Sequence, residues 1–312
     1  MNSTIDTSNP SVEQLDFRAT NRTQQRARLE TIGKILTFAT ALALVIPVLS
    51  IIAYIFFEAS PVLSWNYIWD NPSDGSRAGG VWSPLIGTFY LVLVSLLIVA
   101  PVGILAGIYL NEYASDNWFT RIVNMAVTSL AGVPSIVHAL FGVGAFVLFF
   151  KMGPSLLAAS CTVAVMTVPV IITATREAMA AVPQSFREAC WNMGASKWQT
   201  IRTIVLPNSI SGILTGVILE IARAAGETAP ILFTGAVYFS DVADSGFDKF
   251  MPYYLGDKFM ALSMHLHVIS TQITDMPVKM QFGCAAVIVG LIFVVNSVAI
   301  ALRVYLRSVK RW

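Results

Sequence analysis

Charge is scarce in this 312-residue chain. Only 12% of the residues are charged and 55% are hydrophobic, whereas about a quarter of an average soluble domain is charged. This composition excludes a soluble globular enzyme and a disordered chain. The net charge of +2 and the pI near 8.4 also exclude a nucleic-acid-binding protein, because such a protein needs a concentrated basic surface.

Several chemical signatures are missing as well. The three cysteines, Cys161, Cys190 and Cys284, are too few and too scattered for a disulfide framework or a zinc site, so we expect buried apolar residues. His265 and His267 have no nearby cysteine or carboxylate pair and make a poor metal site. No G-x-x-x-x-G-K-[ST] motif occurs, and the chain is therefore not expected to bind ATP through a P-loop.

Long apolar runs make up most of the chain. A bilayer core is crossed by about 20 apolar residues in a helix. Six stretches meet this requirement: Ile35–Phe57, Leu85–Leu110, Ile122–Phe150, Ser155–Thr175, Ser209–Val237 and Phe282–Leu302. They predict an all-α fold, a polytopic bundle of six transmembrane helices. Residues 35–312 are expected to form one transmembrane domain with a long loop at 176–208.

The basic residues predict the orientation of this bundle. Residues 1–34 are polar, lack the apolar core of a signal peptide, and predict a cytoplasmic tail. This tail, the connection 111–121, the loop 176–208 and the chain end after Leu302 hold 14 of the 20 basic residues. Because basic residues gather on the cytoplasmic side of a membrane, we expect both termini and the long loop to be cytoplasmic.

The break after Gly132 is a candidate for a pathway feature. Pro134 follows Gly132 and precedes Ser135, and a helix that restarts there would offer free N–H groups to an anion. Transporters often use such broken helices near their pathway. The alternative is a kink that serves packing alone.

The loop 176–208 carries the pattern of two short amphipathic helices. Ser185 and Glu188 fit a capping box, Gly194 fits a helix end, and Ser196 and Gln199 fit a second capping box. Apolar residues follow at helical spacing in both segments: Phe186, Ala189, Cys190 and Met193 in the first, and Trp198, Ile201 and Val205 in the second. Such helices can lie on lipid, pack under their own bundle, or dock with a partner. The alternating charges argue against helices that lie on lipid. Packing under the bundle and docking with a partner both remain open.

Three charged residues fall within the fifth predicted span. Glu220, Arg223 and Glu227 follow one another at spacings of three and four, which predicts that they share one helical face. Arg223 is the central residue of Ser209–Val237, so a straight helix would hold it near the middle of the bilayer. Charges at that depth are costly and are expected to pair or to face water. Arg176, at the end of the fourth span, is a candidate anion contact or a membrane anchor.

The long loop resembles the EAA loop of ABC importer permeases. The matching positions in the stretch from Arg187 to Pro207 are Glu188, Ala189, Gly194, Leu206 and Pro207. Two further stretches, 131–142 and 221–235, resemble motifs of phosphate-importer permeases. The form Gly226-Glu-Thr-Ala-Pro230 is similar to the PstA type of subunit.

This resemblance implies a function and a set of partners. The chain would be the PstA-type permease subunit of a phosphate ABC importer in the bacterial inner membrane and would catalyse no covalent step. It implies a PstC-type second permease, two PstB-type ATPase subunits that bind ATP and Mg²⁺, and an extracytoplasmic PstS-type phosphate-binding protein. Its EAA loop would couple it to the ATPase.

For this family we expect Arg223 to contact phosphate in transit. A guanidinium group donates two parallel hydrogen bonds to a tetrahedral oxyanion. Glu227 and Glu220 are then counter-charges, and Arg176 is an inner contact. The alternative is a static salt-bridge cluster. Rival functions are a permease for sulfate, molybdate or phosphonate, an intramembrane enzyme acting on lipid phosphates, and a non-transporting membrane scaffold.

Overall fold

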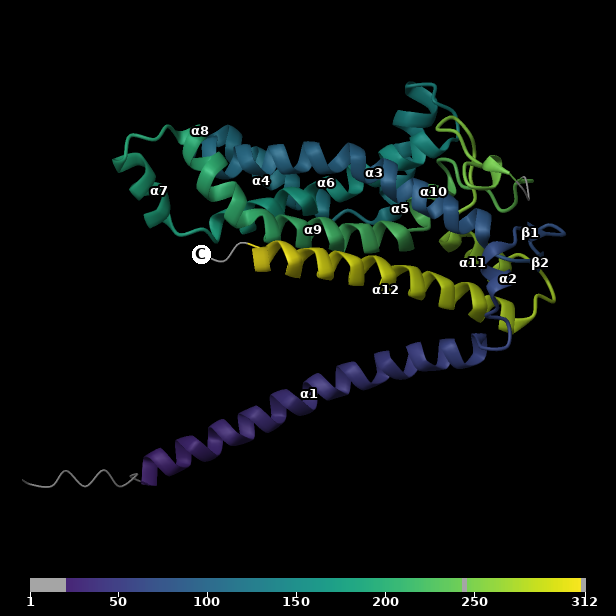
Figure 1. The fold of residues 1–312 in the computed structure, drawn as a ribbon, viewed down its shortest axis with the longest axis horizontal. Coiled ribbons are helices and arrows are strands. Elements are labelled where there is room, and N and C mark those ends of the chain that lie inside the picture. The colour runs from purple at the N-terminus through teal and green to yellow at the C-terminus, as the bar shows by residue number, and fades with distance from the viewer. Residues whose placement is uncertain (1–20, 243–245, 310–312) are drawn as a thin grey trace, which may run out of the picture. The chain divides into compact units, whose positions relative to one another are not determined.

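The computed structural model describes residues 21–242 and 246–309, and most of them are helical (Figure 1). The chain forms two compact units that meet within helix α1, at Tyr54 and Ile55. The α1 helix covers Asn21–Ala59, and its part from Leu29 is apolar enough to cross a membrane. It therefore contains the predicted span Ile35–Phe57. Residues 1–20 of the predicted tail lie outside the described residues.

After α1, the second unit continues with a short irregular segment and a long helix. Helix α2 (Trp65–Trp69) precedes an antiparallel hairpin of β1 (Pro72–Ser73) and β2 (Ala78–Gly79), in which Pro72 pairs with Gly79. Helix α3 (Trp82–Ile108) follows and widens into a π-helical turn, η1 (Tyr109–Tyr113).

The remaining helices complete this unit in chain order. They are α4 (Trp118–Ala131), α5 (Ser135–Gly142), the π-helical η2 (Val143–Phe149), α6 (Leu156–Ala180), α7 (Gln184–Asn192), α8 (Lys197–Thr200), the π-helical η3 (Ile201–Val205), α9 (Leu206–Gly226), α10 (Ala229–Leu232), the 3-10 turn η4 (Phe247–Lys249), α11 (Leu262–Thr271) and α12 (Val278–Val309).

Within the described residues, five helices are long and apolar enough to cross a membrane. The third predicted span, Ile122–Phe150, is not one helix. It consists of α4 and the pair α5–η2, which are bent by 105° at the break between them. The helix restarts at Ser135, as predicted, because Pro134 adopts an extended conformation (φ −59°, ψ 143°) and has no N–H to continue a helical ladder. Counting this bent pair as one span gives the six that the sequence predicts.

Helices α3, α6, α9 and α12 run alongside one another (Figure 1), and α6 contacts both α3 and α9. At one end of this bundle lie α7 and α8, which we call the α7 end. At the other lie the β-hairpin, α2 and α11, which we call the hairpin end. Two glycines bring α9 close to α6. A Cβ on Gly212 would lie 2.7 Å from the Cβ of Ala178, and one on Gly216 would overlap the side chain of Ala174.

We predict that Gly216→Ala destabilises the bundle. The added methyl group must push α9 away from α6, and overpacking of this kind costs about 1–3 kcal/mol. The same substitution at Gly290 of α12 is a matched control, because nothing lies within 4 Å of the Cβ position there. Thermal unfolding in detergent should show a lower midpoint for Gly216→Ala only. Equal midpoints for the two variants would refute the close α6–α9 contact.

The hairpin end encloses a buried histidine. His265 of α11 is 4% exposed, and burial lowers the pKa of its imidazole from 6.5 to about 4. The neighbouring His267 is exposed. The two rings therefore lie in different environments, although they are only two residues apart.

Stability should depend on pH through His265. Below pH 6.5 the unfolded chain binds a proton that the folded chain does not bind until about pH 4, so stability falls as pH falls through this window. The loss reaches about 3 kcal/mol, at 1.36 kcal/mol per pKa unit. Thermal unfolding midpoints between pH 7 and pH 4 should fall less steeply for His265→Leu than for the native chain. His267→Leu should retain the native slope, and parallel curves for all three proteins would contradict the assignment.

Candidate functional site

Helix α7 begins two residues earlier than the predicted capping box requires. Its first residue is Gln184, its N-cap is Pro183, and no side chain among the described residues caps it. Ser185 therefore lies inside the first turn and cannot cap it, so the predicted box of Ser185 and Glu188 is wrong. Pro183 ends the preceding connection in an extended conformation (φ −57°, ψ 141°) and sets the start of α7. Glu188 is left exposed on the helix surface.

The turn between α7 and α8 matches its prediction. Gly194 has φ +84°, a conformation that favours glycine. The N–H of Gly194 donates to Trp191 O at 2.9 Å, and that of Ala195 donates to Cys190 O at 3.0 Å. This pair of bonds is the Schellman motif, which satisfies the last carbonyls of a helix. The capping box of Ser196 and Gln199 at the start of α8 is confirmed with both of its bonds.

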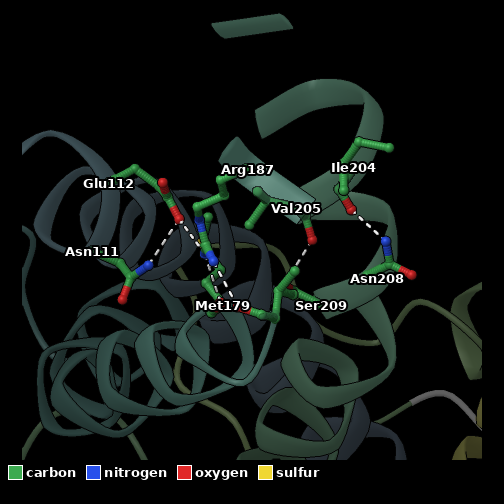
Figure 2. A network of polar contacts seen from close by, with 9 residues as sticks. Asn111, Glu112, Met179, Arg187, Ile204, Val205, Asn208 and Ser209 are labelled. Carbon is green, nitrogen blue, oxygen red and sulfur yellow. Dashed lines mark hydrogen bonds and ion pairs between the residues drawn. The ribbon is translucent and has the colours of Figure 1, made fainter. Parts of the chain in front are cut away.

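The second apolar stripe packs against the chain's own bundle. Ile201 and Val205 are at most 1% exposed and form a cluster with Met179 and Val182. Trp198 does not join them, since it is 58% exposed. The segment widens into η3 directly before Leu206 and Pro207, because Pro207 has no N–H to donate to the carbonyl four residues earlier. The Asn208 side chain donates to the neighbouring carbonyl, Ile204 O, at 2.7 Å (Figure 2).

The first apolar stripe, in contrast, is open. Phe186 is 52% exposed and Met193 is 87% exposed. Between α7 and the start of α9 lies a mainly apolar groove of about 400 Å³, lined by Phe186, Ala189, Cys190, Thr203, Ile204, Pro207 and Asn208. One helix of the loop therefore packs under the bundle, and the other presents an apolar face beside a groove. Exposed apolar surface of this kind is typical of a docking site.

A buried ion pair fixes α7 to the bundle (Figure 2). Nη2 of Arg187 lies 2.8 Å from Oε1 of Glu112 in η1, and the two side chains are 8% and 6% exposed. The same guanidinium donates to Met179 O at 2.9 Å and to Val182 O at 2.6 Å. Asn111 donates to Glu112 Oε1 at 2.9 Å. Arg187 thus joins α7, the end of α6 and the turn that extends α3.

The three charges of the fifth span do not share one environment. Nε of Arg223 lies 3.3 Å from Oε1 of Glu227, and these side chains are 46% and 16% exposed. Glu220 is only 5% exposed, and its Oε2 has no hydrogen-bond partner among the described residues. It faces a cavity of about 10 Å³ together with Ser95 and Thr167, which is about the size of one water molecule. Glu227 is therefore the ion-pair partner of Arg223, and Glu220 lies buried beside α3 and α6.

The fifth helix is shorter than predicted. Helix α9 ends at Gly226, and Glu227 leaves it in an extended conformation (φ −71°, ψ 129°). The predicted span Ser209–Val237 is therefore broken, and Arg223 lies in the last turn of α9. Arg223 nevertheless lies near the level of the middle of α3. Glu220 shares its cavity with Ser95, the middle residue of α3, and Arg223 is about 4.5 Å further along α9.

Arg176 lies away from this pair. It follows Thr167, which lines the cavity of Glu220, by nine residues on α6, or about 14 Å towards the α7 end. Its Nη1 donates to Asn124 Oδ1 of α4 at 2.8 Å, and its buried Nε has no partner among the described residues. The structure thus brings Arg223 and Glu227 together and holds Arg176 at a separate level.

Sequence reasoning missed the Arg187–Glu112 pair and the glycine contacts of α9. The two charged residues are 75 positions apart, and no local pattern links them. The glycines were visible as a G-x-x-x-G spacing at 212 and 216, a motif that lets membrane helices approach closely.

Comparison with known proteins places these features in a family. Residues 100–311 match the family described as "Binding-protein-dependent transport system inner membrane component". The chain is 36% identical over 63% of its length to "Phosphate transport system permease protein PstA" of Mycobacterium leprae, and 40% identical over 52% of its length to the protein of that name from Yersinia pestis. These alignments span 64% and 55% of the two relatives. It is also 28% identical over 77% of its length, and 83% of the relative, to "Probable ABC transporter permease protein YqgI" of Bacillus subtilis.

Solved structures agree with this fold. A chain of the MetNI methionine ABC transporter aligns with 74% of this chain and 95% of its own, with a TM-score of 0.54 and 17% identity. A chain of an alginate ABC importer aligns with 93% of this chain and 99% of its own, with a TM-score of 0.55 and 13% identity. At these identities the likeness concerns the fold alone. With its family match across two thirds of the chain, the protein belongs to the inner membrane components of binding-protein-dependent transport systems.

Proposed function

We propose that this chain is one permease subunit of an ATP-driven importer that passes inorganic phosphate across the bacterial inner membrane. The observation that carries the proposal is the Arg223–Glu227 pair, a half-exposed guanidinium 3.3 Å from a carboxylate at the central level of the helices. The relatives named as phosphate transport permeases support phosphate as the ion.

The exposure of Arg223 argues for a second permease subunit. A charged side chain at bilayer depth does not face lipid, because that costs at least about 2.5–3.5 kcal/mol. Since 46% of the Arg223 side chain is uncovered by its own chain, its free side must face a companion subunit or a water-filled pathway. A PstC-type subunit would complete such a pathway between the two chains.

The Arg223–Glu227 geometry suits brief binding of an oxyanion. In the empty pathway the carboxylate of Glu227 neutralises the guanidinium. An arriving phosphate can displace Glu227 and accept two parallel hydrogen bonds from Arg223. Because Glu227 remains adjacent, it competes for Arg223 and favours release. Arg176 is a second anion contact, about 18 Å nearer the α7 end than Arg223.

The α7 end is the site where the ATPase would act. We place it in the cytoplasm, with both termini, because of the basic residues of its connections. The exposed side of α7, including Glu188 and Ala189, together with the groove that Pro207 lines, offers an apolar docking surface. Gly194 fixes the angle between this surface and the part of the loop, up to Leu206, that packs on the bundle. Two PstB-type ATPases with ATP and Mg²⁺ would move it, and a PstS-type protein would deliver phosphate at the hairpin end.

Reconstitution of the complex in proteoliposomes tests this proposal. We expect labelled phosphate to accumulate only with internal ATP and the loaded binding protein, and excess sulfate, molybdate or phosphonate to compete poorly. ATP-driven accumulation of one of those ions, with none of phosphate, would reassign the substrate. An assembled complex that hydrolyses no ATP and accumulates no anion would favour a scaffold.

A further inference from the structure

The Arg187 guanidinium lies where three segments of the chain meet. Its two terminal nitrogens contact Glu112 of η1 and the carbonyls of Met179 and Val182 at the end of α6. Its own backbone belongs to α7. The side chains of Arg187 and Glu112 are more than nine-tenths buried, and bonds made by an ionised guanidinium are stronger than bonds between neutral groups.

We propose that the Arg187–Glu112 pair is the joint that makes α3 and α6 follow α7 when the ATPase moves the coupling loop. Arg187 is then a positioning residue for transport, one that touches neither phosphate nor ATP. The inference rests on the proposed function, because it assumes that force enters the chain through α7.

The two helices on the far side of this joint are arranged to move together. A Cβ on Gly103 of α3 would lie 2.7 Å from Ile171 of α6, and one on Gly107 would lie 2.6 Å from Thr175. The α6 side chains fill the space beside these α3 glycines, and this interlocking keeps the two helices from sliding independently. A displacement of Arg187 therefore acts on one body made of α3 and α6.

The apolar contacts of the loop hold it in place but do not fix its direction of motion. Ile201 and Val205 pack on Met179 and Val182, and apolar surfaces of packed helices can shear past one another. Hydrogen bonds to a planar, rigid guanidinium are directional. Arg187 makes them to two different segments at once, so α7 cannot shift without pulling both.

Lysine cannot replace this arrangement. Its ammonium group keeps the charge but is a single point donor on a flexible stem, whereas Arg187 reaches its acceptors with two separate nitrogens. Arg187→Lys should therefore keep the loop attached and transmit its movement poorly. Poor transmission lowers the number of phosphate ions taken up per ATP hydrolysed. A loss of folded protein lowers phosphate uptake and ATP hydrolysis together and leaves this ratio unchanged.

The experiment uses the complete complex in proteoliposomes, normalised to assembled permease and ATPase. We expect phosphate uptake per ATP hydrolysed to fall at least fivefold in Arg187→Lys and in Glu112→Gln. The double variant Glu112→Met/Arg187→Met guards against misfolding, because replacing both members of a buried pair with apolar residues is often neutral for stability. It should show the same fall.

The surface ion pair of Arg121 and Asp116 provides the matched control. Nε of Arg121 lies 3.0 Å from Oδ1 of Asp116, and the two side chains are 69% and 79% exposed. Asp116→Asn should leave phosphate uptake per ATP hydrolysed unchanged. If the assembled double Met variant took up as much phosphate per ATP hydrolysed as the native complex, the proposed role of the Arg187–Glu112 pair would be overturned. Failure of all three variants to assemble would also overturn it, since the pair would then serve folding alone. If the native complex itself takes up no phosphate, the proposed function fails first, and the two failures are thereby distinguishable.

Discussion

Replacing Arg223 with glutamine is expected to lower ATP-driven phosphate uptake about 100-fold in a complex that assembles normally. A hydrogen bond to a charged group contributes about 1.5–3 kcal/mol, and each 1.4 kcal/mol corresponds to a tenfold change. Glutamine removes the charge and the forked pair of donors, and Glu227 is then left without its partner at 3.3 Å. Arg223→Lys should be intermediate, because it keeps the charge and loses the fork.

Assembly must be measured separately from uptake in this series. Pull-down of the ATPase and the thermal unfolding midpoint report assembly, and labelled phosphate reports transport. Arg121→Gln is the matched control, because Arg121 also forms an arginine–carboxylate pair, which lies on the surface. Normal uptake by a well-assembled Arg223→Gln complex would reduce the Arg223–Glu227 pair to a static contact.

Truncating Phe186 to alanine is expected to weaken ATPase binding by at least about 30-fold. Phe186 is 52% exposed and borders the groove of about 400 Å³ at the α7 end. An aromatic anchor at the centre of an interface typically contributes 2 kcal/mol or more, which is at least about 30-fold in affinity. Titration of the ATPase onto detergent-solubilised permease would measure this change.

Phe149→Ala supplies the comparison for Phe186→Ala. Phe149 is 78% exposed and lies in η2, shortly before α6 begins and thus away from α7. Removing the Phe149 ring should leave the affinity of the permease for the ATPase subunit unchanged. Equal affinities of the Phe186→Ala and native proteins would exclude the α7 face as the centre of the interface.

Local chemistry explains which parts of the fold the sequence could predict. The turn at Gly194 and the cap at Ser196 depend on neighbouring residues alone, and both were predicted correctly. The start of α7 was missed because two cap signals compete within three residues, and Pro183 prevails over Ser185. The bend at Pro134 was foreseen as a restart but not as a 105° change of direction, because that angle depends on packing.

Charges show the same division between local and long-range information. The pairing of Arg223 with Glu227 follows from their spacing of four residues. The buried environment of Glu220 cannot be predicted from residue spacing, because it depends on α3 and α6 covering that side of α9. The contact of Arg187 with Glu112 requires the loop to fold back on η1, and no periodicity in the sequence encodes this.

The most direct test of the account is site-specific photo-cross-linking in membranes that contain the full complex. A photoreactive amino acid at Met193, which is 87% exposed at the end of α7, should form an adduct with the ATPase subunit. The same probe at Tyr254, 76% exposed in the segment that pairs with the start of α6, should form none. An ATPase adduct from position 254, or none from position 193, would contradict the coupling role of α7.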